Sequence, residues 1–556
     1  MNTTSPIPLR KKRNWNYYAI TLALLTILAA GIRLYKLGDY PSGFGQDEAV
    51  VTYDAWSLLT TGREHHGERW PLNMRQYGDY CPGATTYYTL PFVAVLGPTE
   101  LAARLPCALL NIAAVPFFAL LATRLFRSRS IGLFAAALLT VSPWNIYFSR
   151  WATNPCFVAF FEVTTLWMLH RLLTSKDGRG QSFGMAMAVG VMIFLWTHEY
   201  LSEYLFVPFL IGVAMLLWRR QNWDRIIVAG GVYSLLMLPV IVERLHSTGA
   251  NGRLSTDSVF ILKDPLMAFF GGYWDCLSFN FLFHAPPMLP LHQLPGMAHI
   301  NHYLEPLYVL GLLTLAAAII RPGTLLRFLG RLNTLEEASH WRHSAIWVAA
   351  WLALGPIANA LFVPRMYTAR MPHLLVGVIL VIALGCLVVW HLLRRIPAPA
   401  GRAASIVFVA VLTLYLGSQA VKTGRALAAN SSHFGQYLQY GAPDVMRYLA
   451  KQPNVRSVKF SPLNQGYIYH LLFTPVHPSK VNYAEVAPPI PKEGAQWRYA
   501  HIDKVGNYLF NQPLDPAEVA RTATLRHQVR DQKGIVWFDL YEKDGVWFVL
   551  FRRENG

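Results

Sequence analysis

The sequence predicts a mainly α-helical protein that crosses a membrane about eleven times and ends in a small α/β domain. Three observations predict this fold class. Hydrophobic residues make up 53% of the 556 residues. Charged residues make up 14% of the chain, whereas soluble proteins carry about 25%. The hydrophobic residues also gather in separate runs of about 18 residues, which is the length of a helix that spans a bilayer.

The predicted spans are defined by these apolar runs. They cover residues 16–35, 105–123, 131–148, 155–170, 183–199, 201–218, 226–243, 303–320, 345–363, 372–391 and 403–420. The first run is long and has no clear small-residue cleavage site, so we expect a membrane helix there instead of a cleaved signal peptide. The run "PGATTYYTLPFVAVLG" at 82–97 is shorter, and we expect an interfacial or re-entrant helix.

Lysine and arginine set the predicted orientation. They recur at the N-terminus and in every second loop, at 10–13, 124–129, 171–179, 219–225, 321–342 and 394–402. Basic loops stay on the cytoplasmic side. The sequence therefore predicts a multi-pass protein of the cytoplasmic membrane with a cytoplasmic N-terminus. The net charge of +18 follows from this topology, and we expect no nucleic-acid partner.

Two regions follow from that topology. Residues 1–420 form the predicted membrane region, and the first large outer loop covers 36–104. Residues 421–556 form the predicted extracytoplasmic domain. Within it, "APDVMRYLAKQ" at 442–452 predicts a helix, and "GIVWFDLYEKDGVWFVLFRR" at 534–553 predicts a β-hairpin that turns at "KDG".

Charged side chains on the outer face are the main functional signal. Asp47 and Glu48 stand side by side just past the first span. Asp47 as a simple helix N-cap is the structural alternative. Arg150, Arg365 and Arg370 are nearly the only basic residues in the short outer loops. Arginine binds phosphate oxygens in pairs and a carboxylate accepts a hydroxyl proton, so the pattern favours a phosphate-bearing lipid substrate.

The ordered motifs resemble one enzyme superfamily. "QDEA", "YDAWSLLTTGREHHG", "ARLPCALL" and "SPWNIYFSR" follow one another between residues 46 and 150. This series resembles the bacterial protein O-mannosyltransferases and lipid A aminoarabinose transferases, which are GT-C glycosyltransferases. The resemblance covers about 16–420 and is strongest over 40–155. It implies transfer of a sugar from a polyprenyl-phosphate donor, with inversion, to a hydroxyl of a lipid, polysaccharide or protein in the cell envelope.

The resemblance also implies roles for individual residues. The catalytic base falls on Asp47, with Glu48 beside it. Arg150 would lie near the donor, and the segment "VPRMYTAR" would contact the lipid phosphate through Arg365, Tyr367 and Arg370. Two further residues are candidates for substrate binding. Asp79 is the nearest match to a second acidic residue, although the Pro pair that follows it in relatives is replaced by "CPG" here. Tyr87 belongs to a tyrosine group that would either stack on sugar or form an interfacial belt.

The sequence is also compatible with other functions and leaves the cofactors undecided. A transporter of lipid-linked sugars and an envelope scaffold are the alternative functions. The chain contains no phosphate-binding glycine loop, so we expect no nucleotide cofactor. Several outer histidines, among them His65, His66 and His198, leave a divalent metal ion undecided. The enzyme hypothesis predicts that Asp47, Arg150 and Arg370 converge within roughly 10–12 Å, a span that one substrate pocket bridges.

Overall fold

A computed structural model describes residues 13–552 except 78, 175–178, 219–222, 248–257, 285–291, 295, 331–333, 364–365, 430–437, 464, 475 and 487–501. Within this part of the chain, seven helices are long and apolar enough to cross a membrane. They are α1 (Arg13–Leu34), α4 (Glu100–Phe126), α7 (Val158–Thr174), α10 (Trp223–His246), α13 (Glu305–Ile320), α17 (Pro372–Leu393) and α18 (Ala400–Ala429). All seven coincide with predicted spans.

Shorter helices cover three of the other predicted spans and the run at 82–97. Among the apolar ones are α3 (Ala84–Leu96), α5 (Arg129–Thr140), α8 (Arg179–Thr197) and α9 (Glu203–Trp218). The predicted span 131–148 is divided, because Pro143 opens a separate helix, α6 (Pro143–Phe148). Helix α3 is short, as expected for the run at 82–97. The number of membrane crossings stays a prediction.

The predicted span 345–363 is wrong in its position. Helix α15 covers Leu335–Leu354, so it begins ten residues earlier and ends before Pro356. Thr334 caps the helix by accepting a hydrogen bond from the Glu337 amide (3.1 Å). The acidic first turn, Glu336 and Glu337, favours the positive end of the helix dipole. The predicted span is placed by its apolar residues. The first turns of α15 are polar and are started by a capping residue, so that search sets the beginning of the helix too late.

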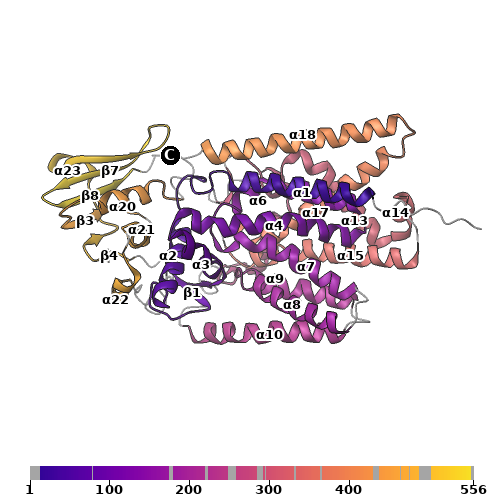
Figure 1. Cartoon of the computed structure of the whole chain (residues 1–556), viewed down its shortest axis with the longest axis horizontal. Helices are drawn as coiled ribbons and strands as arrows, with labels where there is room; N and C mark the ends of the chain where they lie inside the picture. Colours follow the sequence, from indigo (N-terminus) through magenta and orange to yellow (C-terminus); the bar gives the residue numbers. More distant parts are fainter. Residues whose placement is uncertain are drawn as a thin grey trace, which may run out of the picture.

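The long helices form a bundle with clearly different ends (Figure 1). Helix α14 (Pro322–Phe328) lies at one end. At the other end lie α2 (Gln46–Thr61), α3, β1 (Asn73–Gln76) and the C-terminal sheet. Strand β1 pairs antiparallel with β2 (Asp79–Pro82). Short helices α12 (Pro265–Leu277) and α16 (Ile357–Ala360) complete the membrane region. The outer-loop elements and the C-terminal elements therefore share one end of the molecule.

Helix α17 forms the centre of the bundle. Every residue from Pro372 to Val388 is buried, as expected for a helix that is apolar on all sides. Its contact with α13 depends on two glycines. A Cβ added at Gly311 would lie 1.9 Å from the Val381 carbonyl oxygen, and one at Gly385 would lie 2.0 Å from that of Leu307. Glycine thus lets the two helices approach closely, as small residues do in membrane bundles.

The C-terminal part forms a six-stranded sheet in the order β4-β5-β3-β8-β7-β6. The strands are β3 (Ser457–Phe460), β4 (Lys504–Val505), β5 (Tyr508–Leu509), β6 (Thr524–Arg530), β7 (Val536–Lys543) and β8 (Val546–Phe551). The helices of this part are α20 (Ala442–Ala450), α21 (Gly466–Phe473), α22 (Tyr483–Val486) and α23 (Pro516–Thr522). The predicted helix is α20, and the predicted hairpin is β7–β8. Asp544 and Gly545 have φ of 52° and 79° in its turn, as a tight two-residue hairpin turn requires.

The C-terminal part docks directly on the first outer loop. The Phe44 amide donates to the Leu438 carbonyl (2.9 Å), and the Tyr469 hydroxyl donates to the Phe44 carbonyl (2.7 Å). Farther along α2, the Tyr53 hydroxyl donates to the Val476 carbonyl (3.0 Å). These bonds join segments more than 390 residues apart. The end of the bundle is therefore built from both regions.

Candidate functional site

Helix α2 begins at the predicted catalytic pair. Gly45 is the N-cap, and its amide donates to Glu48 Oε2 (2.9 Å). Asp47 lies in the first turn and its side chain is half-buried. The structural alternative, in which Asp47 caps the helix, is therefore not the geometry observed. A negative side chain at this place still benefits from the positive end of the helix dipole.

Glu48 is fully buried and each of its carboxylate oxygens accepts two hydrogen bonds. Arg104 donates through Nε to Oε1 (2.8 Å) and through Nη2 to Oε2 (3.1 Å). The Ala152 amide also donates to Oε1 (3.2 Å). The same guanidinium contacts the backbone carbonyls of residues 37, 38, 41 and 43. This geometry gives Glu48 a structural role and leaves Asp47 as the candidate base.

Two tyrosines define the surroundings of Asp47. The Tyr77 hydroxyl donates to the Gln46 carbonyl (2.6 Å), and Tyr469 is the residue already bonded to Phe44. Burial raises the pKa of both phenols, and the negative charge of Asp47 raises each further. The Asp47 carboxylate therefore lies within electrostatic reach of both rings. Sequence reasoning missed Tyr469, because its segment shows only the pattern of a small buried helix.

Arg150 bonds to the backbone after α1, and its predicted place near the donor stays a prediction. Its Nη1 donates to the carbonyls of Ile32 and Arg33, and its Nη2 donates to those of Tyr35, Lys36 and Tyr40, at 2.8–3.1 Å. The side chain is almost completely buried. The last carbonyls of a helix lack partners within the helix. Arg150 supplies those partners at the end of α1 through Nη1 and Nη2, and these two atoms hold the loop after α1.

Arg370 and Tyr367 lie in a second aromatic cluster. Arg370 ends the 3₁₀ turn η7 (Thr368–Arg370), and its guanidinium carbon lies 4.6 Å from the centre of the Tyr367 ring and 5.4 Å from that of Phe362. Its contacts with the Val363 carbonyl are long, at 3.4 and 3.5 Å. The Arg370 side chain is 8% exposed. This is a cation held by aromatic faces, a setting suited to an anionic ligand.

A line of ring contacts connects Arg370 with the start of α2. The centres of the Tyr367 and His292 rings are 4.2 Å apart, and those of His292 and Trp151 are 5.7 Å apart. A Cβ added at Gly45 would lie 3.4 Å from Trp151 Nε1. Burial, with a contribution from Arg370, lowers the pKa of His292 to about 3. A chain of contacts therefore leads from the start of α2 to η7, and the convergence of Asp47, Arg150 and Arg370 stays a prediction. Sequence reasoning did not find Trp151, since a single tryptophan gives no motif.

The structure shows no direct contact to the line of rings for the other residues that the sequence singled out and the structure describes. Arg365 lies outside the described residues. The backbone of Asp79 pairs with Gln76 at the β1–β2 turn. The Tyr87 hydroxyl donates to the Pro71 carbonyl (2.7 Å), and its ring stacks on Trp70. Tyr87 thus supports the loop. The His198 ring nitrogens contact the Leu72 carbonyl and the Tyr204 hydroxyl, in agreement with a structural role.

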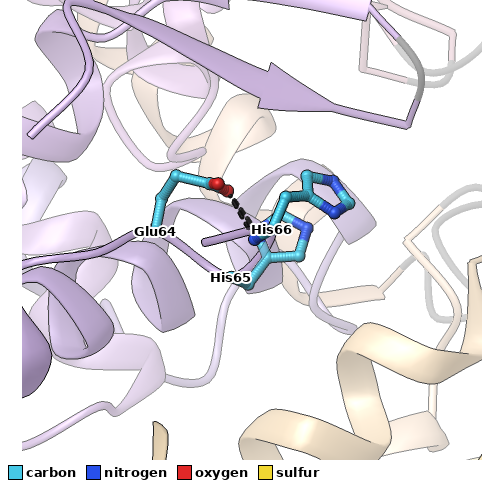
Figure 2. Close-up of side chains that lie close together, drawn as sticks. All are labelled: Glu64, His65 and His66. Atoms are coloured by element: carbon cyan, nitrogen blue, oxygen red, sulfur yellow. Dashed lines mark hydrogen bonds and ion pairs between the residues drawn. The ribbon is translucent and has the colours of Figure 1, made fainter. Parts of the chain in front are cut away.

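One cluster in the first outer loop has the residue types of a metal site. Glu64, His65 and His66 follow α2, and each offers a ligand atom within 4.8 Å of the other two (Figure 2). Asp54 of α2 contacts His65 Nδ1 at 2.6 Å. The cluster lies on the same helix and loop as Asp47, but it is not part of the aromatic line that leads to Arg370.

The chain resembles known glycosyltransferases in two comparisons. The family model described as dolichyl-phosphate-mannose-protein mannosyltransferase matches residues 83–242. The crystal structure of the Archaeoglobus fulgidus oligosaccharyltransferase, tethered with an acceptor peptide, aligns with a TM-score of 0.51 at 12% identity, over 83% of this chain and 63% of that one. The chain thus spans less than two thirds of the archaeal protein. These findings confirm the predicted resemblance to GT-C glycosyltransferases in fold.

Two further structures are similar to the chain. ArnT from Cupriavidus metallidurans bound to undecaprenyl phosphate aligns with a TM-score of 0.48 at 12% identity, over 84% of this chain and 85% of that one. The oligosaccharyltransferase AglB from Archaeoglobus fulgidus, in complex with an inhibitory peptide and a dolichol-phosphate, aligns with a TM-score of 0.48 at 11% identity, over 84% and 64%. No curated protein matches the sequence.

Proposed function

We propose that this protein is an integral-membrane glycosyltransferase. It would move a sugar from a polyprenyl-phosphate donor to a hydroxyl of an envelope acceptor at the outer face of the cytoplasmic membrane, with inversion. One observation carries the proposal. Ring contacts through Trp151, His292 and Tyr367 lead from the start of α2, where the half-buried Asp47 lies, to the aromatic-bound cation of Arg370. The family match over 83–242 supports this class of reaction.

In the proposed reaction Asp47 and Arg370 have separate roles. Asp47 removes the proton of the acceptor hydroxyl as its oxygen attacks the anomeric carbon. The bond from that carbon to the phosphate oxygen breaks, and Arg370 stabilises the negative charge that develops on the leaving phosphate. Arg365 remains a candidate for the same phosphate. The sugar is a hexose or a pentose, and the acceptor is a lipid, a polysaccharide or a protein.

The proposed topology places both residues outside the cell. The N-terminus and the basic loops lie in the cytoplasm, and the C-terminal part lies outside. Domain boundaries at 1–420 and 421–556 belong to the same proposal. Helix α18 continues to Ala429, so it carries the chain from the membrane toward the C-terminal sheet.

The transporter alternative rests on a separate observation. Glu162, Glu199 and Glu203 are fully buried, and both carboxylate oxygens of Glu199 have no hydrogen-bond partner among the described residues. Buried acidic groups in membrane bundles often mark a path for a substrate or an ion. A transporter would carry the lipid-linked sugar across without breaking its glycosidic bond, and this difference makes the two functions distinguishable.

The deciding experiment measures sugar transfer from a panel of radiolabelled polyprenyl-phosphate sugars by the purified protein in detergent. We expect one donor to turn over. Asp47→Asn should lower kcat about 10²–10⁴-fold, the usual contribution of general base catalysis, and should leave donor binding intact. Asp39→Asn is the matched control, because Asp39 is an exposed carboxylate of the same loop and should keep full activity.

The other outcomes reject specific parts of the proposal. Movement of an intact donor across vesicle membranes without hydrolysis or transfer would support the transporter. Binding without transfer or movement would support the scaffold. Full activity of Asp47→Asn would retain the enzyme but reject Asp47 as its base.

A further inference from the structure

The loop after α2 contains a compact group of metal-ligand side chains that the proposed reaction does not use. The Glu64 amide donates to the Glu68 carbonyl (2.9 Å), and the Gly67 amide donates to the Glu64 carbonyl (2.9 Å). Gly67 has φ of 96°, a conformation that glycine adopts readily. This tight turn directs Glu64, His65 and His66 toward one another (Figure 2).

Two buried carboxylates meet at one imidazole. Asp54 Oδ1 lies 2.6 Å and Glu64 Oε2 lies 3.3 Å from His65 Nδ1, and all three side chains are fully buried. In the described part of the chain, neither carboxylate forms an ion pair with a lysine or an arginine. Arg75 is near enough to affect the cluster electrostatically. Buried carboxylates without a direct cationic partner are costly, so this site is suited to a bound cation.

Ligand atoms remain available within the cluster. His66 Nδ1 bonds to the Val486 carbonyl (2.7 Å), so it carries the proton and leaves a lone pair on Nε2. That Nε2 atom is buried and has no hydrogen-bond partner among the described residues. Asp54 holds His65 Nδ1 in the way that carboxylates orient histidine ligands of metals. The Glu64 oxygens each accept one amide hydrogen bond and retain a second lone pair.

We propose that Glu64, His65 and His66 bind a divalent transition-metal ion of the zinc type, which fastens the first outer loop to the C-terminal part. Two imidazoles with one carboxylate are a zinc ligand set, whereas calcium and magnesium select oxygen ligands. Ligands at about 2.1 Å in tetrahedral geometry lie about 3.4 Å apart. The ligand atoms here lie within 4.8 Å of one another, so small side-chain movements complete the site.

The cluster lies against α21 and α22 of the C-terminal part. His66 bonds through Nδ1, the nitrogen that the ion would not use, to the Val486 carbonyl at the end of α22. The Tyr467 hydroxyl of α21 lies 3.1 Å from His65 Nε2, so it would border the ion. A Cβ added at Gly67 would lie 3.1 Å from the Tyr483 ring. The metal would therefore stabilise an interface between the two regions. This inference stands independently of the proposed glycosyltransferase activity.

The test measures metal binding by the full-length protein in detergent. After dialysis against a weak chelator, elemental analysis should find about one zinc ion per chain, as one His₂Glu site requires. His66→Gln removes a ligand and should lower zinc affinity by more than the ~10–100-fold that loss of an orienting neighbour costs. Asp54→Asn changes such a neighbour and should cost about 10–100-fold. His477→Gln is the control, because His477 is an exposed histidine at the same interface.

Measurements on the unmodified protein keep the proposal testable even if a variant fails to fold. X-ray absorption at the zinc edge should show nitrogen and oxygen ligands, with the scattering pattern of imidazole. A strong chelator should lower the melting midpoint of the unmodified protein and leave that of His66→Gln unchanged. A protein without stoichiometric zinc, or zinc affinity unchanged in His66→Gln, would overturn the proposal and identify the cluster as a hydrogen-bond network.

Discussion

Replacing Glu48 by Gln should destabilise the protein because of the partners that the carboxylate has in the structure. Four donors converge on its two oxygens: the Gly45 and Ala152 amides, and Nε and Nη2 of Arg104. Glutamine keeps one oxygen and replaces the other by an NH₂ group, which is itself a donor. Two of the four donors would then face a donor, and the buried Arg104 charge would lose its counter-ion.

The expected magnitude follows from the burial of the pair. Both side chains are 0% exposed, so solvent does not screen their interaction. Removing one partner of a buried ion pair costs about 3–5 kcal/mol, because the other charge is left uncompensated. Glu100→Gln is the matched control. It makes the same chemical change in the Glu100–Arg447 pair, which is 22% and 44% exposed, and should cost about 1 kcal/mol or less.

The assay compares the melting midpoints of purified variants in detergent with their sugar transfer. Glu48→Gln should melt well below the unmodified protein and lose activity only in proportion to the folded fraction. Asp47→Asn should melt normally and lose transfer. A Glu48→Gln protein that melts like the unmodified protein but transfers no sugar would contradict the structural role of Glu48 and identify Glu48 as the base.

Two further substitutions, Arg150→Lys and His470→Phe, test how these buried side chains contribute to stability. Arg150→Lys should lower stability by at least about 2 kcal/mol, because one ammonium cannot bond the five carbonyls that Arg150 contacts. A raised donor KM at an unchanged melting midpoint would instead return Arg150 to the donor site. His470 stacks on Tyr508 at 3.7 Å, and burial lowers its pKa to about 3. Unfolded histidine titrates near pH 6.5, so the unfolded state binds the additional proton and stability should fall by about 1.4 kcal/mol per pH unit as the pH drops below 6.5. His470→Phe keeps the stacked ring and should remove this part of the acid sensitivity in melting experiments between about pH 7 and pH 5. An equal acid response in both proteins would contradict it.

The features that the sequence predicted well are those set by local patterns. Long apolar runs identified all seven helices of the described chain that are long and apolar enough to cross a membrane, because their length and composition suit a bilayer. The β7–β8 hairpin followed from alternating residues around Asp544 and Gly545. Helix α15 was misplaced because its start depends on the Thr334 cap instead of hydropathy. A capping search over polar segments would have found it.

The roles of the charged residues depended on partners distant in the chain. Asp47 and Glu48 are indistinguishable as neighbours in a sequence, but adjacent residues on a helix point about 100° apart. The position of Arg104, 56 residues away, shows that Glu48 has a buried cationic partner. Arg150 looked like a substrate ligand because it was rare on the outer face. Its partners are backbone carbonyls, which any sequence supplies and no motif reveals.

The same dependence on distant partners assigns a task to the C-terminal part. Helix α21 contributes Tyr469, whose phenol lies within reach of the Asp47 charge, and Tyr467, which contacts His65. These residues are two positions apart on one short helix. A movement of α21 would therefore alter the surroundings of the proposed base and of the proposed metal site together. A metal ion beside α21 would in this way keep Tyr469 in place next to the proposed base while the acceptor and the lipid donor enter and leave.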